Sequence, residues 1–115
     1  QYLYEANAAI LKAGLFNSIA EEFAINKIAA HSHLYTSEEK IKFPGRVFKI
    51  IETFPFQKKV FKKLGIQKAN ITTRNFPLSV EQIRKKLSIK DGGNTYLFFT
   101  TNKNNEKLIV VCEKA

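Results

Sequence analysis

Four polar side chains at every second position are the residues of this sequence best suited to binding chemistry: Lys68, Asn70, Thr72 and Arg74. Successive side chains of a strand point to opposite faces, so these four share one face if the segment is extended. Two cations with an amide and a hydroxyl between them offer donors to phosphate oxygens and to sugar or base edges. The row therefore predicts a nucleic-acid contact. The alternative is the solvated face of an ordinary strand.

The end of this predicted strand adds a second kind of binding group. Arg74, Asn75 and Phe76 place a guanidinium, an amide and an aromatic ring in succession. Such groups at an exposed strand end can hold a phosphate or stack a base. Arg46, at the head of another predicted strand, is expected to join the same patch. In the alternative interpretation Phe76 packs in the core, and Arg74 pairs with Glu52 or with a backbone carbonyl.

The positive charge of the chain is concentrated around these residues. Residues 40–90 carry fourteen Lys or Arg against two Glu, a net charge of +12, whereas residues 1–39 carry −3 and residues 91–115 are neutral. This concentration favours a polyanionic partner such as nucleic acid. The alternative is a solvated lysine surface that binds nothing. Salt-sensitive, nonspecific attraction is expected from the basic residues of 58–63 and 84–86, among them Lys58, Lys62, Arg84 and Lys85.

The elements that position these residues follow from apolar periodicity and from cap and turn signals. Residues 46–56 are dense in β-branched and aromatic side chains and predict a strand that ends at Pro55. A short helix with Gly65 at its end follows, and then the strand 68–74, so the three predict a βαβ unit with parallel strands. Ser79 and Gln82 form a capping box for a second helix. Residues 95–101 and 107–113 predict a hairpin.

The N-terminal third has a different pattern. Asn7 can cap a helix that ends near Gly14, and Ser18 with Glu21 forms a capping box for another. A short strand is expected around 33–35. The chain as a whole predicts an α+β fold in which N-terminal helices precede a β-α-β-α-β-β mixed sheet. We expect one compact domain with a helical subregion at 1–40 and an α+β core at 41–115.

Several classes of function lack the residues they need. No closely spaced glycines follow a strand, so no cofactor-binding cradle and no bound cofactor are predicted. His31 and His33 would share a strand face, but no third metal ligand is evident. Cys112 follows "LIVV" in an apolar strand and predicts a small core residue rather than a nucleophile. With no catalytic set, no metal set and no apolar run long enough to cross a membrane, we expect a cytoplasmic binding domain.

The chain begins with Gln1 and contains no Met. Because translation starts with Met, we expect this sequence to be a piece of a longer protein.

Four blocks of the sequence resemble a known family: "YLYEANAAILKAGLF", "SHLYTS", "FPGRVFKIIETFPF" and "KANITTRNFPLSVEQIRKKLSIKDGGNTYLF". They are similar to the C-terminal THUMP-like domain of bacterial, largely Bacteroidetes-type, class I S-adenosylmethionine-dependent methyltransferases. The likeness covers nearly the whole chain. Family members usually read Glu-Pro-Asn where this chain has Glu5-Ala6-Asn7, a change that keeps the helix cap.

The resemblance implies an upstream methyltransferase domain that uses S-adenosylmethionine. It also implies a substrate-recruiting role for the basic face, because THUMP domains are associated with RNA binding beside RNA-modifying enzymes. We therefore expect an accessory, RNA-binding domain whose partners are RNA and the methyltransferase domain of the same chain. The alternative is a structural appendage that stabilises the methyltransferase or makes it a homo-oligomer, without binding nucleic acid.

Overall fold

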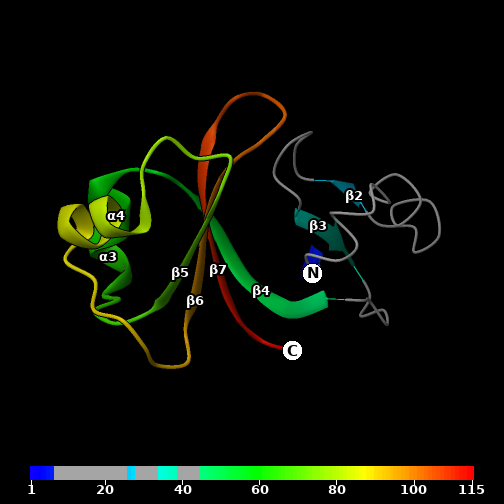
Figure 1. Cartoon of the computed structure of the whole chain (residues 1–115), viewed down its shortest axis with the longest axis horizontal. Coiled ribbons are helices and arrows are strands. Elements are labelled where there is room, and N and C mark those ends of the chain that lie inside the picture. Colours follow the sequence, from blue (N-terminus) through cyan, green and yellow to red (C-terminus); the bar gives the residue numbers. More distant parts are fainter. Residues whose placement is uncertain (7–25, 28–33, 39–44) are drawn as a thin grey trace.

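The computed structural model describes residues 1–6, 26–27, 34–38 and 45–115 (Figure 1). These residues form one sheet and two helices, named here as in Figure 1. The helices are α3 (Lys58–Leu64) and α4 (Val80–Leu87). The strands are β1 (Tyr2–Ala6), β2 (Asn26–Lys27), β3 (Leu34–Ser37), β4 (Gly45–Pro55), β5 (Asn70–Arg74), β6 (Tyr96–Thr101) and β7 (Lys107–Lys114).

The strands lie in the order β2-β3-β1-β4-β7-β6-β5. Neighbouring strands are antiparallel except β5 and β6, which are parallel and are connected through α4. β4 and β5 run in the same direction, as the βαβ prediction requires, but β7 and β6 lie between them. The predicted α+β class with a mixed sheet is confirmed.

The sheet has two faces with separate clusters of buried side chains. On the helix-side face, Phe61 of α3 and Ile83 of α4 pack against Leu97 and Phe99 of β6. On the opposite face, which none of the described helices covers and which we call the helix-free face, Phe98 of β6 joins residues of β1, β3, β4 and β7. Figure 1 shows α3 and α4 on one side of the crossing strands β4 to β7, and β2 and β3 on the other. Because successive side chains of β6 point to opposite faces of the sheet, this strand contributes residues to both clusters.

An irregularity in β4 changes which side chains face the helices. The register against β7 shifts between Ile50 and Glu52. Before the shift, Phe48 and Ile50 belong to the helix-free cluster, and after it Phe54 packs on the helix-side cluster. Ile51, at the shift, is 57% exposed. A bulge that places an extra residue in one strand reverses the alternation in this way.

Both helices begin and end where the sequence predicts. In α4, Ser79 Oγ accepts a hydrogen bond from the Gln82 amide at 3.2 Å, and Gln82 Oε1 accepts one from the Ser79 amide at 2.8 Å. This is the predicted capping box, which satisfies two amide donors at the start of the helix. Gly65 ends α3 with φ +65°, a left-handed conformation that glycine adopts without a Cβ penalty.

The predicted hairpin is confirmed as β6 and β7, and the strand expected around 33–35 is β3. The prediction omitted β1 and β2. In the subregion expected to be helical at 1–40, the described residues lie in or beside strands. The helices predicted from Asn7 to Gly14 and from Ser18 onward lie outside the described residues, as do His31 and His33.

Candidate nucleic-acid interface

The predicted polar row lies on the helix-free face of the sheet. Asn70, Thr72 and Arg74 are in parallel register with Tyr96, Phe98 and Thr100 of β6, and Phe98 belongs to the helix-free cluster. Residues in register on adjacent strands share a face, so the row is directed away from α3 and α4. The common face inferred from the sequence is therefore present, on the edge strand β5.

The first two residues of the row, Lys68 and Asn70, contact the turn that leads into β6. Asn70 Nδ2 donates to the carbonyls of Gly93 at 3.0 Å and Thr95 at 3.2 Å. Lys68 forms an isolated bridge with Lys90, and its side chain crosses the turn so closely that a Cβ at Gly92 would lie 2.9 Å from Lys68 Cε. The Asn70 side chain therefore holds the 91–95 turn, whereas the Lys68 side chain lies against the turn and is exposed.

Arg74 forms an ion pair with a carboxylate to which sequence reasoning gave no role. Its Nη2 lies 2.6 Å from Glu5 Oε2, and its Nη1 donates to the Thr73 carbonyl at 2.9 Å. Glu52, the partner considered from the sequence, is beyond the β4 irregularity and in register with Val111 of the helix-side cluster. The backbone carbonyl considered as the other partner is confirmed.

Arg46 binds the same carboxylate from the other side. Its Nε donates to Glu5 Oε1 at 2.7 Å, and its Nη2 lies 2.6 Å from that oxygen. The Glu5 side chain is 9% exposed, against 55% for Arg46 and 35% for Arg74. We call these three residues the Glu5 clamp. Arg46 and Arg74 do share a patch, as expected, but a buried carboxylate joins them.

The clamp also indicates how strongly the sheet curves. Glu5 is on β1 and Arg74 on β5, which are four strands apart in the sheet order. At about 4.8 Å between neighbours, a flat sheet would separate the two strands by about 19 Å. The direct ion pair therefore requires the sheet to curl around its helix-free face, bringing β1 toward β5.

The aromatic residue at the end of β5 is part of the core. The Phe76 ring lies edge-on to Phe56, with centroids 5.0 Å apart, and 5.7 Å from the Phe99 centroid. Asn75 has φ +53°, and its carbonyl accepts a hydrogen bond from Thr101 Oγ1 at 2.7 Å. The Phe76 ring thus packs against the helix-side cluster, as in the alternative interpretation.

Arg84 also makes internal contacts. Its guanidinium donates to the carbonyl of Ala69 at 3.3 Å and to that of Ile89 at 3.4 Å, and it pairs with Asp91 at 2.9 Å. It therefore ties α4 to the residue before β5 and to the loop after the helix. Lys85, its neighbour, is exposed.

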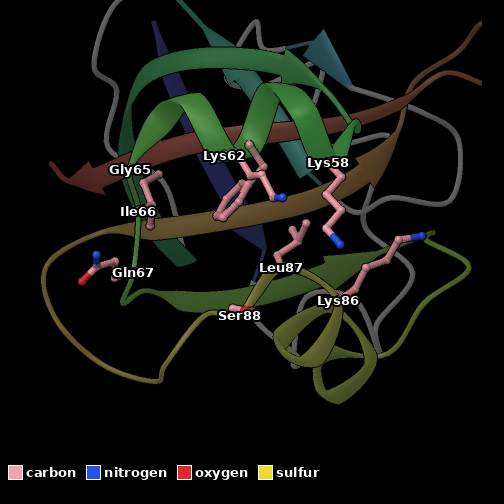
Figure 2. Close-up of a pocket in the computed structure, with 9 residues that line it drawn as sticks. Lys58, Lys62, Gly65, Ile66, Gln67, Lys86, Leu87 and Ser88 are labelled. Carbon is pink, nitrogen blue, oxygen red and sulfur yellow. The ribbon is translucent and has the colours of Figure 1, made fainter.

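Three of the exposed lysines lie between the two helices. Lys58 and Lys62 of α3 and Lys86 of α4 border a hollow of about 270 Å³, which we call the lysine hollow. Figure 2 shows the two helices facing each other across it, with two of these lysines extending from one helix and one from the other. The remaining lining residues are Phe61, Gly65, Ile66, Gln67, Leu87 and Ser88.

The electrostatics of the lysine hollow favour an anion. No carboxylate lines it, and among the described residues none of its three lysines forms an ion pair. The Lys86 ammonium lies 5.6 Å from the Phe56 ring centroid, so an aromatic face rather than an acid supports it. Phe61 and Leu87 are buried and supply an apolar floor. The site can hold phosphate oxygens without displacing an existing partner.

Other chemistry has little support in the described part of the chain. No group of three His, Cys, Asp or Glu side chains there could hold a metal ion. Cys112 is fully buried on β7, as predicted, and burial raises the pKa of its thiol to about 12. No helix among the described residues is long and apolar enough to cross a membrane.

Comparisons with known proteins identify two adjoining regions. Residues 45–114 match the family model described as THUMP domain-like, and residues 2–44 match a model described as a ferredoxin-like domain. The two models meet four residues after the boundary expected at 40/41. The Glu5 clamp therefore joins one carboxylate of the ferredoxin-like region to two arginines of the THUMP-like region.

A solved structure matches over the whole chain. It is the crystal structure of a "putative methyltransferase from Porphyromonas gingivalis W83", with a TM-score of 0.92 and 40% sequence identity over 100% of this chain. The chain spans 29% of the length of that protein. The comparison with curated proteins gave no match.

Proposed function

Because the chain belongs to the THUMP domain-like family, we propose that it is an RNA-binding accessory domain that recruits substrate to a methyltransferase. The observation that carries the proposal is the lysine hollow, where three lysines from two helices border one cavity that no carboxylate lines. Cations without partners gain most from a polyanion, because binding relieves their mutual repulsion and releases counterions from the phosphates.

The structure changes which predicted residues we assign to RNA. Lys58, Lys62 and Lys85 are exposed on the helix side, so they are available to phosphates. Arg74 forms an ion pair with Glu5 and Arg84 one with Asp91, so we assign both arginines a structural role. The proposed contact site is therefore the lysine hollow itself. Lys85, which is exposed but does not line the hollow, and Lys68, which precedes β5, add only general attraction.

S-adenosylmethionine is assigned to the methyltransferase part of the protein. The described glycines with positive φ end α3 or form the 91–95 turn, so they do not make a phosphate- or nucleoside-binding turn between a strand and a helix. We assign no step of the methyl transfer to the residues of this chain.

The test is RNA binding by two triple variants that remove equal charge. One replaces the lysines of the hollow (Lys58→Ala, Lys62→Ala, Lys86→Ala), and the other replaces exposed neighbours on the same helices (Lys59→Ala, Lys63→Ala, Lys85→Ala). Labelled transfer RNA and ribosomal RNA fragments are titrated at several salt concentrations by fluorescence anisotropy. The hollow variant should flatten the slope of log affinity against log salt by about 2, as expected when three phosphate contacts are lost.

The matched variant separates a site from general charge. Equal losses in the two triple variants would mean attraction to the whole lysine surface, with no site at the hollow. Absence of binding by the unmodified chain at low salt would contradict the RNA proposal and favour the structural appendage. Lys68→Ala tests the β5 row without disturbing the Glu5 clamp.

A further inference from the structure

The helix-free face carries another hollow, which shares no lining residue with the lysine hollow. It lies where the start of β4, the start of β6 and the end of β7 meet, and its volume is about 370 Å³. We call it the Arg46 hollow. This volume lies within the roughly 300–1,000 Å³ range of small-molecule sites. Its lining residues are Arg46, Val47, Phe48, Tyr96, Lys114 and Ala115.

The Glu5 clamp fixes Arg46 in an unusual way for an exposed arginine. The carboxylate of Glu5 receives Nε and Nη2, so one edge of the guanidinium is occupied. Its central carbon lies 5.2 Å from the Phe48 ring centroid, yet the side chain is still 55% exposed. An arginine held at its edge and backed by an aromatic ring presents a rigid planar face to solvent. That geometry suits stacking better than bidentate phosphate binding.

The rest of the hollow supplies the other groups that a nucleotide needs. Tyr96 packs on Phe48 with centroids 5.0 Å apart and lines both this hollow and an adjoining one of about 270 Å³. Lys114 also lines both and is exposed, so its ammonium can reach a phosphate. Glu113 lines the adjoining hollow but not the Arg46 hollow, so the phosphate is placed in the Arg46 hollow. Asn94, at the adjoining hollow, offers an amide that can both donate and accept at a base edge.

We propose that the Arg46 hollow binds one nucleotide unit, with the base stacked on the Arg46 guanidinium beside Tyr96 and the phosphate near Lys114. The unit is either a free nucleoside monophosphate or an unpaired nucleotide within RNA, since the two present the same ring and phosphate. The proposal does not depend on the lysine hollow, which is formed by different elements on the other face of the sheet.

The test is a titration of the ¹⁵N-labelled chain with 5′-AMP, adenosine, inorganic phosphate and a short single-stranded RNA. Backbone amide shifts should move at Phe48, Tyr96 and Lys114 with 5′-AMP, with the RNA, or with both. Movement with 5′-AMP identifies a free nucleotide as sufficient, and movement with RNA alone identifies the polymer as the source. Adenosine lacks the phosphate contact and inorganic phosphate lacks the base stack. Each should therefore bind at least about fivefold more weakly than whichever of 5′-AMP and the RNA binds.

Variants then distinguish stacking from charge. Arg46→Lys keeps the charge but removes the plane and should weaken binding at least about fivefold, the lower limit for loss of one base stack. Tyr96→Leu is the second variant, used if Arg46→Lys does not fold, and should have a similar effect. Lys114→Ala removes the phosphate contact and should also weaken binding at least about fivefold. Lys103→Ala, in the β6–β7 turn, removes one charge away from the hollow and should change nothing.

Three results would overturn the proposal. The first is no shift at the hollow with either 5′-AMP or RNA. The second is equal binding by Arg46→Lys, or by Tyr96→Leu where that variant is used. The third is loss of the shifts in the triple variant of the lysine hollow, since the two sites are independent. Conversely, a failure of RNA binding at the lysine hollow leaves the shifts with 5′-AMP intact.

Discussion

Neutralising Glu5 should destabilise the fold more than neutralising any exposed carboxylate. In the variant Glu5→Gln the side chain keeps its size, but it loses the charge that both Arg46 and Arg74 contact. The Gln amide also directs its own N–H groups at one of the two guanidiniums, so at least one present contact becomes donor against donor. The variant therefore breaks both ion pairs and at least one of the two hydrogen bonds.

The magnitude follows from the burial of the three groups. Removing one partner of a fully buried ion pair costs about 3–5 kcal/mol, and a single hydrogen bond to a charged group contributes about 1.5–3 kcal/mol. Arg46 and Arg74 are 55% and 35% exposed, so water can solvate both once Glu5 is neutral. We therefore expect a loss of about 2 kcal/mol in the free energy of unfolding. For a chain of this length that is a fall in Tm of about 8 °C.

Urea denaturation followed by circular dichroism measures the loss, with Glu52→Gln as the control because Glu52 is an exposed carboxylate on β4. Arg74→Gln leaves Glu5 paired with Arg46 and should cost less, about 1 kcal/mol. In the Glu5→Gln background the same Arg74 change should cost almost nothing. A loss below about 0.5 kcal/mol for Glu5→Gln, or additive losses in the double variant, would show that the clamp is a surface pair of little energetic weight.

Two further predictions concern Arg84 and Cys112. Arg84→Ala should lower the free energy of unfolding by about 1–2 kcal/mol, because the contacts with two backbone carbonyls and one carboxylate are lost. The adjacent Lys85→Ala should change it by less than about 0.5 kcal/mol, and urea denaturation measures both. Cys112 should not react with thiol reagents at pH 8 in the folded chain and should react in urea, since burial raises the pKa of its thiol to about 12. Rapid labelling of the folded chain would mean that β7 opens readily.

The elements from residue 45 onward were predictable because their signals are local. A capping box, a glycine helix stop and two apolar runs around a polar turn each specify a structure within a few residues. β1 has no such signal: its five residues are followed at once by Asn7, a helix-cap type, and its pairing with β4 joins Leu3 to Phe48 across more than forty positions. Contacts at that separation are fixed by the tertiary fold and cannot be read from periodicity.

The shared face of the β5 row was predictable for the same local reason, but its partners were not. The period of two placed Asn70, Thr72 and Arg74 together, as observed. The carboxylate that pairs with Arg74 is 69 residues away and reaches it only because the sheet curls. The β4 irregularity also hid the correct partner, because it turns Glu52 toward the helix-side face and away from Arg74. A one-residue shift in the alternation of a strand cannot be read from its composition.

The net charge of +12 in residues 40–90 combines two populations that act differently. All three arginines of the chain, Arg46, Arg74 and Arg84, form internal ion pairs, whereas no lysine does so among the described residues. The planar fork of arginine suits fixed carboxylates and carbonyls, and the hydrated ammonium of lysine stays at the surface. Among the described residues, the positive side-chain charge without an acidic partner is therefore all lysine, which attracts phosphates as point charges without reading sequence. Under the proposed function, selectivity for one RNA has to come from a site with a defined shape, and the Arg46 hollow, with its planar cation and aromatic wall, is a described surface that has one.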